Sequence, residues 1–360
     1  MGIKIIHIIS SLSRGGRERQ LATLVSSTNQ QKYPTKIIYF NKKTISYIDE
    51  YGLQDTAIQI KEKGKLKRLV ELHKILKSEK PDIVYTWGNG ESVSILLLKP
   101  FHSFKFINGS VRHGIRAKSF SHYYRTLILH LSPNIVANSR AGLKANNLRK
   151  GNVIYNGIEN KFFEPIPNRS TCRKELIGIP ESTPVLISVA NLVPYKDYFS
   201  ILEALKLIKE KGLNFHYIIL GEGPMRKEIQ SKINSYNLTD NTRILGNVEN
   251  VADYLKVSDI FIHSSKGEGC SNAILEAMAA GLPIIASRTG GTSEIVKDHY
   301  GSLFRYQDYR KLFEIIELFI KDSSLRKKFS EESRLTAEKK FSLQAMMNEY
   351  YNVLNKILPQ

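Results

Sequence analysis

The 360-residue chain is poor in cysteine, with only Cys172 and Cys270. Two cysteines provide neither a disulfide framework nor a metal-ligand spacing, so the sequence predicts a reducing, cytoplasmic compartment. Long apolar runs are also missing, and none approaches the roughly 20 residues that a membrane-spanning helix needs. The apolar segment at 4–9 has no small-residue cleavage site after it, so we expect a buried strand there and not a signal peptide.

Acidic residues are scarce in the first half of the chain. Residues 1–165 contain 27 Lys and Arg against 11 Asp and Glu, a net charge of +16, whereas residues 166–360 carry +3. Residues 101–150 hold nine basic residues and no acidic one. This asymmetry predicts a polyanionic or membrane partner for the first half. The alternative is that these lysines only keep the protein soluble.

The sequence lacks tandem repeats and low-complexity segments, and its length suits two α/β domains better than one core. Short apolar runs typical of buried parallel strands alternate with helical patterns throughout. The expected strands lie within 4–9, 36–40, 81–86, 104–111, 135–139, 255–263 and 282–287, and at the start of the segments 185–197, 215–229 and 243–265. The clearest expected helices lie at 61–77, 273–280, 308–340 and 341–358.

Most of the sequence features that suggest chemistry lie within 263–294. A polar loop with two glycines precedes the helix at 273–280, and a second glycine turn follows the next strand. Ser271 or Asn272 is expected to cap that helix. Two helix N-termini side by side favour a phosphate ligand. The eight-residue spacing of two glutamates, 268 and 276, suits two contacts along one extended ligand, although a solvated Glu near a helix start fits it equally.

The run EGCSNAILE at 268–276, followed by AMAAGLPIIAS and a Gly-Gly pair, closely resembles the E-x7-E signature of the retaining, group 1 glycosyltransferases of family 4. The resemblance extends over nearly the whole chain. It implies the GT-B fold, an α/β fold of two Rossmann-like domains facing each other across a cleft, and a nucleotide-sugar donor. By this resemblance Glu268 faces the donor sugar and Glu276 binds the ribose hydroxyls.

The family usually places Arg and Lys five residues apart to neutralise the donor diphosphate. This chain keeps Lys196 but has Asn191 at the arginine's position, so we expect a diphosphate site with one cation fewer. Arg226 or a helix terminus is a candidate to compensate. The resemblance assigns further donor-binding positions to Gly15, Gly16, Gly221, Gly246, Asn247, Val248, Gly269, Cys270, Ser271 and Asn272.

Residue His113 follows the strand expected at 104–111, where family members carry a polar group near the donor sugar. The alternative is a structural loop histidine. The predicted catalytic residues are therefore His113, Glu268 and Lys196. No residue is identified as a covalent nucleophile, which leaves the retaining mechanism open. The candidate contacts to an anionic acceptor are Arg14, Arg17, Arg112 and Arg116.

We expect an acceptor-side domain at 1–165, a linker at 165–168 and a donor-binding domain at 168–341. The helix at about 342–360 is expected to pack back on the first domain. Two segments suit an anionic membrane surface: the amphipathic helix at 61–77, with its basic start, and the mixed basic and aromatic segment at 118–130. Ordinary packing on the sheet is the alternative for both.

The sequence as a whole predicts a hexosyl- or N-acetylhexosaminyltransferase that moves a sugar, from a UDP-linked donor, to a glycan or lipid-linked acceptor. The expected pathway is bacterial O-antigen, capsule or lipopolysaccharide synthesis at the inner face of the cytoplasmic membrane. The chain has no Asp-x-Asp pair, so we expect no metal and no cofactor. The alternatives are a GT-B sugar-nucleotide epimerase, a phosphorylase, or a basic nucleic-acid-binding protein. A nucleic-acid partner is not expected, because the sequence contains no recognition motif for one.

Overall fold

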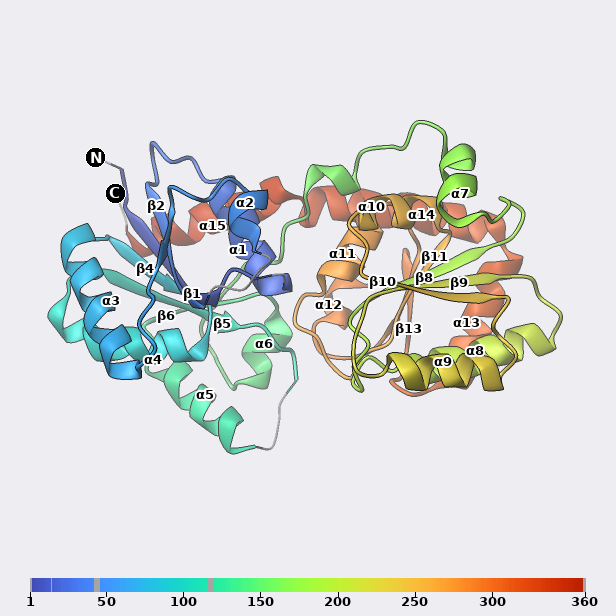
Figure 1. Cartoon of the computed structure of the whole chain (residues 1–360), viewed down its shortest axis with the longest axis horizontal. Coiled ribbons are helices and arrows are strands. Elements are labelled where there is room, and N and C mark those ends of the chain that lie inside the picture. Colours follow the sequence, from blue (N-terminus) through green and yellow to red (C-terminus); the bar gives the residue numbers. More distant parts are fainter. Residues whose placement is uncertain (1, 14, 42–45, 116–118, 359–360) are drawn as a thin grey trace. The chain divides into compact units, whose positions relative to one another are not determined.

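The computed structural model of the chain describes residues 2–13, 15–41, 46–115 and 119–358 (Figure 1). It divides into two units. Unit 1 comprises residues 1–157 and 343–360, and unit 2 comprises residues 158–342. The first boundary falls earlier than the predicted linker, because Ile158 pairs with Ser342 and donates its N–H to the Phe341 carbonyl at 2.8 Å.

In its described residues, unit 1 contains a seven-stranded parallel sheet of order β3-β2-β1-β4-β5-β6-β7. Its strands are β1 (Ile5–Ser11), β2 (Thr35–Asn41), β3 (Ala57–Gln59), β4 (Ile83–Thr86), β5 (Lys105–Val111), β6 (Asn134–Ala137) and β7 (Asn152–Val153). Its helices are α1 (Gly16–Ser26), α2 (Tyr47–Glu50), α3 (Lys65–Glu79), α4 (Asn89–Leu98), the 3-10 turn η1 (Lys99–Phe101), α5 (Phe120–His130), α6 (Arg140–Ala145) and α15 (Leu343–Ile357).

Strand β1 carries isoleucine at four of its seven positions because both faces of the sheet are covered by helices. Side chains alternate along a strand, so Ile5 and Ile9 pack in the core formed with α1 and α15. Ile6 and Ile8 point the other way, into the core formed with α3 and α4. Figure 1 shows these two helical layers on opposite sides of the sheet.

Unit 2 contains, in its described residues, a six-stranded parallel sheet of order β10-β9-β8-β11-β12-β13. Its strands are β8 (Val185–Val189), β9 (His216–Leu220), β10 (Thr242–Gly246), β11 (Ile260–His263), β12 (Ile284–Ser287) and β13 (Gly301–Phe304). Its helices are the 3-10 turn η2 (Asn160–Phe162), α7 (Arg169–Ile177), α8 (Tyr198–Glu210), α9 (Arg226–Ser235), α10 (Val251–Val257), α11 (Asn272–Ala279), α12 (Thr292–Ile295), α13 (Tyr309–Lys321) and α14 (Ser323–Lys340).

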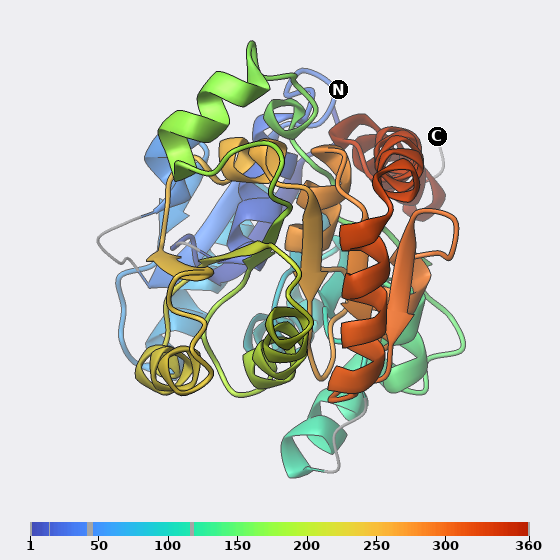
Figure 2. The same ribbon diagram turned by 90° about the vertical axis from the view of Figure 1, so that its right-hand side faces the viewer.

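Helices α8, α9 and α13 share one apolar core with the strands of unit 2. Figure 2 shows α8 and α9 side by side, and the two helices contact each other. On the other face, α11 packs against α14. None of the helices in the described ranges is both long and apolar enough to cross a bilayer.

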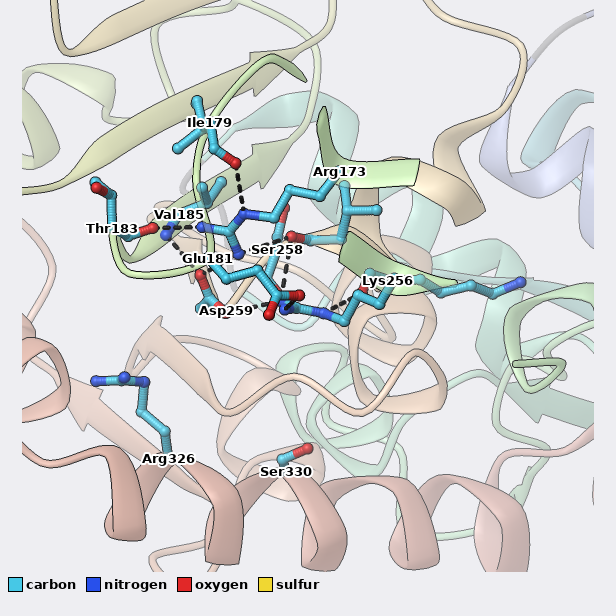
Figure 3. A network of polar contacts seen from close by, with 12 residues as sticks. Arg173, Ile179, Glu181, Thr183, Val185, Lys256, Ser258, Asp259, Arg326 and Ser330 are labelled. Atoms are coloured by element: carbon cyan, nitrogen blue, oxygen red, sulfur yellow. Dashed lines mark hydrogen bonds and ion pairs between the residues drawn. The ribbon is translucent and has the colours of Figure 1, made fainter. Parts of the chain in front are cut away.

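A buried ion pair joins the start of unit 2 to its sheet (Figure 3). The Arg173 side chain on α7 has no exposed surface, and its Nη1 donates to Asp259 Oδ2 at 2.8 Å. The same carboxylate accepts from Arg169 Nη2 at 2.7 Å and from the Val185 backbone N–H at 2.8 Å. Because Asp259 directly precedes β11, the pair holds α7 against the amino ends of β8 and β11.

We expect Asp259→Ala to lower the free energy of unfolding by about 3–5 kcal/mol, because it leaves the guanidinium of Arg173 buried without its counter-charge. Glu181→Gln is the matched control. Glu181 is 52% exposed and lies 3.5 Å from Arg169, so its loss should cost less than about 1 kcal/mol. Urea unfolding followed by circular dichroism measures both. Equal losses for the two variants would contradict a structural role for the buried pair.

Candidate functional site

The two central strands of the sheet in unit 2 bring Lys196 and Glu268 together. Lys196 lies in the loop after β8, and Glu268 lies in the loop after the neighbouring parallel strand β11. The carboxyl ends of parallel strands meet at one edge of a sheet, where ligands commonly bind in open α/β folds. There the Lys196 ammonium donates to Glu268 Oε1 and, at 3.2 Å, to Nε2 of His263.

Residue His263, the last residue of β11, is buried beneath this ion pair. Its Nε2 lies 3.7 Å from Glu268 Oε1. An ammonium group can only donate, so Nε2 of His263 is the acceptor and its ring is neutral. Burial and the charge of Lys196 both lower the pKa of His263. His263 was not among the predicted site residues, since a histidine at the end of an apolar run gives no signal by itself.

The pKa of Glu268 reflects a balance between burial and its neighbours. Burial alone would raise this pKa, but the charge of Lys196 and its hydrogen bond to the carboxylate outweigh that effect and hold the pKa well below its usual range. Glu268 is therefore a carboxylate at neutral pH. Its Oε1 also accepts from the Ser265 hydroxyl at 3.3 Å.

Hydrogen bonds fix the loops that carry these charges. Asp197 caps α8 by accepting from the Ser200 N–H, and its second oxygen accepts from Ser264 Oγ at 3.0 Å. The Lys266 N–H donates to the Tyr195 carbonyl at 2.9 Å. The loops after β8 and β11 are thus held together at two points. Asp197 is a further residue that sequence reasoning missed.

The loop after β12 is fixed to the same place. Ser287 Oγ accepts from the Ser265 N–H at 2.9 Å and donates to the Ser265 carbonyl at 2.8 Å. The predicted Gly-Gly turn follows, and the Gly291 N–H donates to the Glu268 carbonyl at 2.9 Å. Gly290 has φ +50°, and a Cβ there would lie 2.3 Å from the Glu268 carbonyl oxygen. Glycine is required here by both backbone conformation and space.

Residue Glu276 lies in α11, about one turn beyond the start of the helix, and only 3% of its surface is exposed. Ser271 is the N-cap residue of α11, but its side chain makes no capping hydrogen bond. Ser271 thus lies at the predicted N-cap position, but its hydroxyl does not accept the hydrogen bond that a capping side chain usually accepts. Gly269, Cys270 and Ser271 are buried in the turn that leads into the helix.

The loops after β8, β9 and β10 form the other half of this edge. The Gly221 N–H donates to the Gly246 carbonyl at 2.7 Å, and a Cβ on Gly221 would lie 2.0 Å from the Ala190 carbonyl oxygen. Asn191 is exposed in the first of these loops, while Asn247 and Val248 follow the third. Arg226 is ion-paired with Glu222.

Unit 1 gathers several of its predicted residues around Trp87, which follows β4. Arg112 stacks on the Trp87 ring, with its guanidinium carbon 4.3 Å from the ring centre. Arg17, on α1, donates to the Trp87 carbonyl at 3.3 Å and forms a 2.8 Å ion pair with Glu18. His113 is exposed beside Arg112.

The predicted glycines of unit 1 begin α1. Gly15 is the N-cap residue and Gly16 is the first residue of the helix. Gly15 has an extended φ of −177°, so its conformation does not require glycine. The predicted acceptor residues Arg14 and Arg116 lie outside the described residues.

A buried histidine supports Trp87 from below. The indole N–H of Trp87 donates to His7 Nδ1 at 3.0 Å, and His7 Nε2 lies 3.0 Å from the Tyr350 hydroxyl on α15. Since the indole can only donate, Nδ1 carries no proton and the neutral ring donates from Nε2 to Tyr350. Burial lowers the pKa of His7 to about 3. The closing helix therefore helps to position the ring on which Arg112 rests.

A second buried group of unit 1, Glu91 on α4, was also not predicted. It lies near Arg17 and Ser10, and burial raises its pKa although both neighbours oppose the shift. Gly88 leaves room for its carboxylate, since a Cβ there would lie 2.4 Å from Glu91 Oε2. Among the described residues, no group of three His, Cys, Asp or Glu side chains is arranged to hold a metal ion.

We expect Gly290→Ala to lower the free energy of unfolding by about 1–3 kcal/mol more than Gly212→Ala does. Both glycines have positive φ, +50° and +71°, but a Cβ on Gly212 would meet nothing within 4 Å. Gly212→Ala therefore measures the cost of backbone strain alone, and the difference between the two variants measures the cost of the collision with Glu268. Thermal unfolding of both variants measures the difference, and equal losses would show that the turn can move away from Glu268.

We expect His7 to lower the free energy of unfolding as the pH is decreased from 6.5 to about 3. Its pKa is depressed from 6.5 in the folded chain, so the unfolded chain takes up the proton first as the pH falls. In that pH window His7 contributes a slope of about 1.4 kcal/mol of unfolding free energy per pH unit, and above the window it contributes no slope. His7→Gln, which does not titrate, should flatten the slope.

Urea unfolding at pH 7, 6, 5 and 4 measures this slope through the fluorescence of Trp87, the single tryptophan of the sequence. His299→Gln, at an exposed position of unit 2, is the control and should keep the wild-type slope. An unchanged slope in His7→Gln would contradict the assignment.

The chain is similar in sequence to known glycosyltransferases. The family model described as "Glycosyl transferases group 1" matches residues 173–336, most of unit 2. An uncharacterized glycosyltransferase of Methanocaldococcus jannaschii is 26% identical over 339 residues, covering 79% of this chain and 82% of the relative. The UDP-Gal:alpha-D-GlcNAc-diphosphoundecaprenol alpha-1,3-galactosyltransferase of Escherichia coli is 28% identical over 266 residues, covering 68% of this chain and 67% of that protein.

Solved structures confirm the predicted fold class. Anabaena HepE in complex with UDP has a TM-score of 0.87 at 18% identity, covering 98% of this chain and 100% of that one. HepE in complex with UDP-glucose has a TM-score of 0.85 at 19% identity, covering 98% and 99%. Residues 173–336 thus match the model of the group 1 glycosyl transferases, within a chain that has the GT-B fold of two Rossmann-like domains.

Proposed function

We propose that the chain is a retaining glycosyltransferase that moves a hexosyl or N-acetylhexosaminyl group from a UDP-linked donor to a glycan or lipid-linked acceptor. The observation that carries the proposal is the cluster of Lys196, Glu268 and His263 at the carboxyl edge of the second sheet. It lies in the part of the chain that matches the group 1 glycosyl transferases. The name of the Escherichia coli relative and the HepE complexes support a uridine nucleotide.

The ion pair suggests how the donor is received. The donor diphosphate is a stronger competitor for an ammonium group than a single carboxylate is, because it carries more charge. We propose that Lys196 turns from Glu268 to the diphosphate when the donor binds. Glu268, released from Lys196, then accepts hydrogen bonds from the sugar hydroxyls. Glu276 holds the ribose.

Bond cleavage at the anomeric carbon leaves negative charge on the diphosphate. We propose that Lys196, the Gly290-Gly291 turn and the N-terminus of α11 stabilise this charge electrostatically, without a metal or another cofactor. Asn191 adds no charge, and Arg226 is already paired with Glu222. We therefore propose a diphosphate site held by one lysine and by backbone N–H groups.

In unit 1, we propose that Arg17 and Arg112 contact an anionic acceptor and that His113 contacts the donor sugar. The strongly basic first half supports an acceptor such as a lipid-linked diphosphate glycan. The Escherichia coli relative is named for a diphosphoundecaprenol acceptor. We accordingly propose a role in bacterial O-antigen, capsule or lipopolysaccharide synthesis, at the inner face of the cytoplasmic membrane.

The first test is a thermal-shift and donor-hydrolysis screen over UDP-, GDP- and ADP-sugars, with and without EDTA. We expect a shift with UDP-sugars alone that EDTA leaves unchanged. Lys196→Met should weaken donor binding by about 10- to 100-fold, because a charge-assisted hydrogen bond to the diphosphate is lost. Glu276→Gln should weaken it at least tenfold while keeping the size of the buried side chain.

Glu314→Gln, at a position whose side chain is 60% exposed on α13, is the matched control and should bind like the wild type. No shift with any nucleotide sugar in a folded sample would contradict the proposed donor site. Conversion of the donor to an isomeric nucleotide sugar without an acceptor would favour an epimerase. The anomeric configuration of a transferred sugar, read by NMR, tests retention.

A further inference from the structure

Helix α5 carries an apolar stripe on its outer side. The stripe follows helical spacing from the first residue of the helix to its C-cap, at positions i, i+3, i+4, i+7 and i+11. Its members, with their exposed fractions, are Phe120 (86%), Tyr123 (59%), Tyr124 (45%), Leu127 (57%) and Leu131 (60%). Single exposed apolar residues are ordinary, but a continuous stripe of large ones marks a binding surface.

Two polar side chains of α5 make hydrogen bonds on the side that faces the protein. Arg125 donates to Asn146 Oδ1 at 3.2 Å and lies 2.8 Å from His122 Nδ1. His122 and Leu129 are buried. The five residues of the stripe are thus left on the exposed side of the helix, without a partner among the described residues. Figure 1 shows α5 at the outer margin of its helical layer in unit 1.

The surroundings of the stripe are positively charged. The sequence has no Asp or Glu between Glu91 and Glu159. At the C-terminal end of α5, an open pocket of about 530 Å³ is lined by His130, Arg149 and Lys150 among others. Arg149 and Lys150 are exposed. The stripe therefore ends beside two cations that have no acidic residue near them in sequence.

We propose that the stripe on α5 is a docking surface for an anionic phospholipid bilayer, with lipid phosphates held by Arg149 and Lys150. A helix of this kind lies in the plane of the interface, its apolar side chains among the acyl chains and its cations at the headgroups. A second copy of the chain is a poorer partner, since two strongly basic surfaces repel each other. The membrane source is favoured because it supplies both the apolar layer and the negative charge.

The position of α5 links this surface to the acceptor side of unit 1. The helix follows β5, and Arg112 and His113 come directly after that strand. Its first turn therefore lies on the same edge of the sheet as the proposed acceptor contacts, and its last turn on the opposite edge. The proposal deepens the proposed function, and it rests on that function only for the membrane-bound acceptor.

The experiment is co-sedimentation of the full chain with vesicles of phosphatidylcholine, with and without 30% phosphatidylglycerol, in about 0.1 M salt, where charges act over roughly 10 Å. We expect binding to the anionic vesicles to exceed binding to the neutral ones at least tenfold. The double variant Phe120→Ser/Leu127→Ser should lose at least tenfold in binding, as should Arg149→Gln/Lys150→Gln.

The matched control is Leu318→Ser/Leu335→Ser, which removes two exposed leucines of unit 2, 51% and 46% exposed, and should bind like the wild type. Phe120→Gln alone, at the most exposed position, covers the case in which the double variant fails to fold. Wild-type binding by this folded variant and by Arg149→Gln/Lys150→Gln would overturn the proposal.

Two further outcomes separate the alternatives. Loss of dimer mass by light scattering in Phe120→Gln, with vesicle binding intact, would assign the stripe to self-association and overturn the membrane assignment. The thermal shift with UDP-sugars is measured on the same samples. If that shift persists while vesicle binding is absent in the wild type, the docking surface fails and the donor site stands. If the wild type binds vesicles but shows no thermal shift with UDP-sugars, the donor site fails and the docking surface stands.

Discussion

The parallel direction of the strands is the constraint on which both units depend. In a parallel sheet every strand ends at the same edge, so the loops that follow neighbouring strands must meet there. In unit 2 this rule places Lys196 against Glu268, although 72 positions separate them. In unit 1 it places Arg112 on the ring of Trp87. Helices cover both faces of each sheet, which leaves the edge as the place where polar groups can gather.

A charge held at such an edge is expensive to bury unless a partner accompanies it. Glu268 is kept ionised by Lys196, and the loops around it are bonded to one another through Asp197 and Ser287. These bonds hold Lys196 and Glu268 together, and the proposed donor diphosphate would replace Glu268 as the partner of Lys196. The Arg173–Asp259 pair is different, because both oxygens of Asp259 already accept hydrogen bonds from Arg173, Arg169 and the Val185 N–H.

Sequence patterns predicted most of the strands and the helices around 263–294, because short apolar runs bounded by Gly and Pro leave few alternatives. They missed β3, β7 and β13, which are only two to four residues long. They selected Lys196 and Glu268 as separate site residues without indicating that the two would pair. The order in which strands neighbour one another decides such pairs, and residue patterns do not encode it. His263 and His7 were missed for a related reason, since their roles depend on buried partners far away in the sequence.

The order of the chain has a consequence for how the protein is made. Unit 2 is a continuous segment inserted between the two parts of unit 1. A ribosome therefore releases every residue of unit 2 before it releases α15, whose Tyr350 bonds to His7 across 343 positions. The nascent first unit must wait with one side of its core uncovered while the second unit can already fold. The core around β1 is thus closed only after α15 has been made.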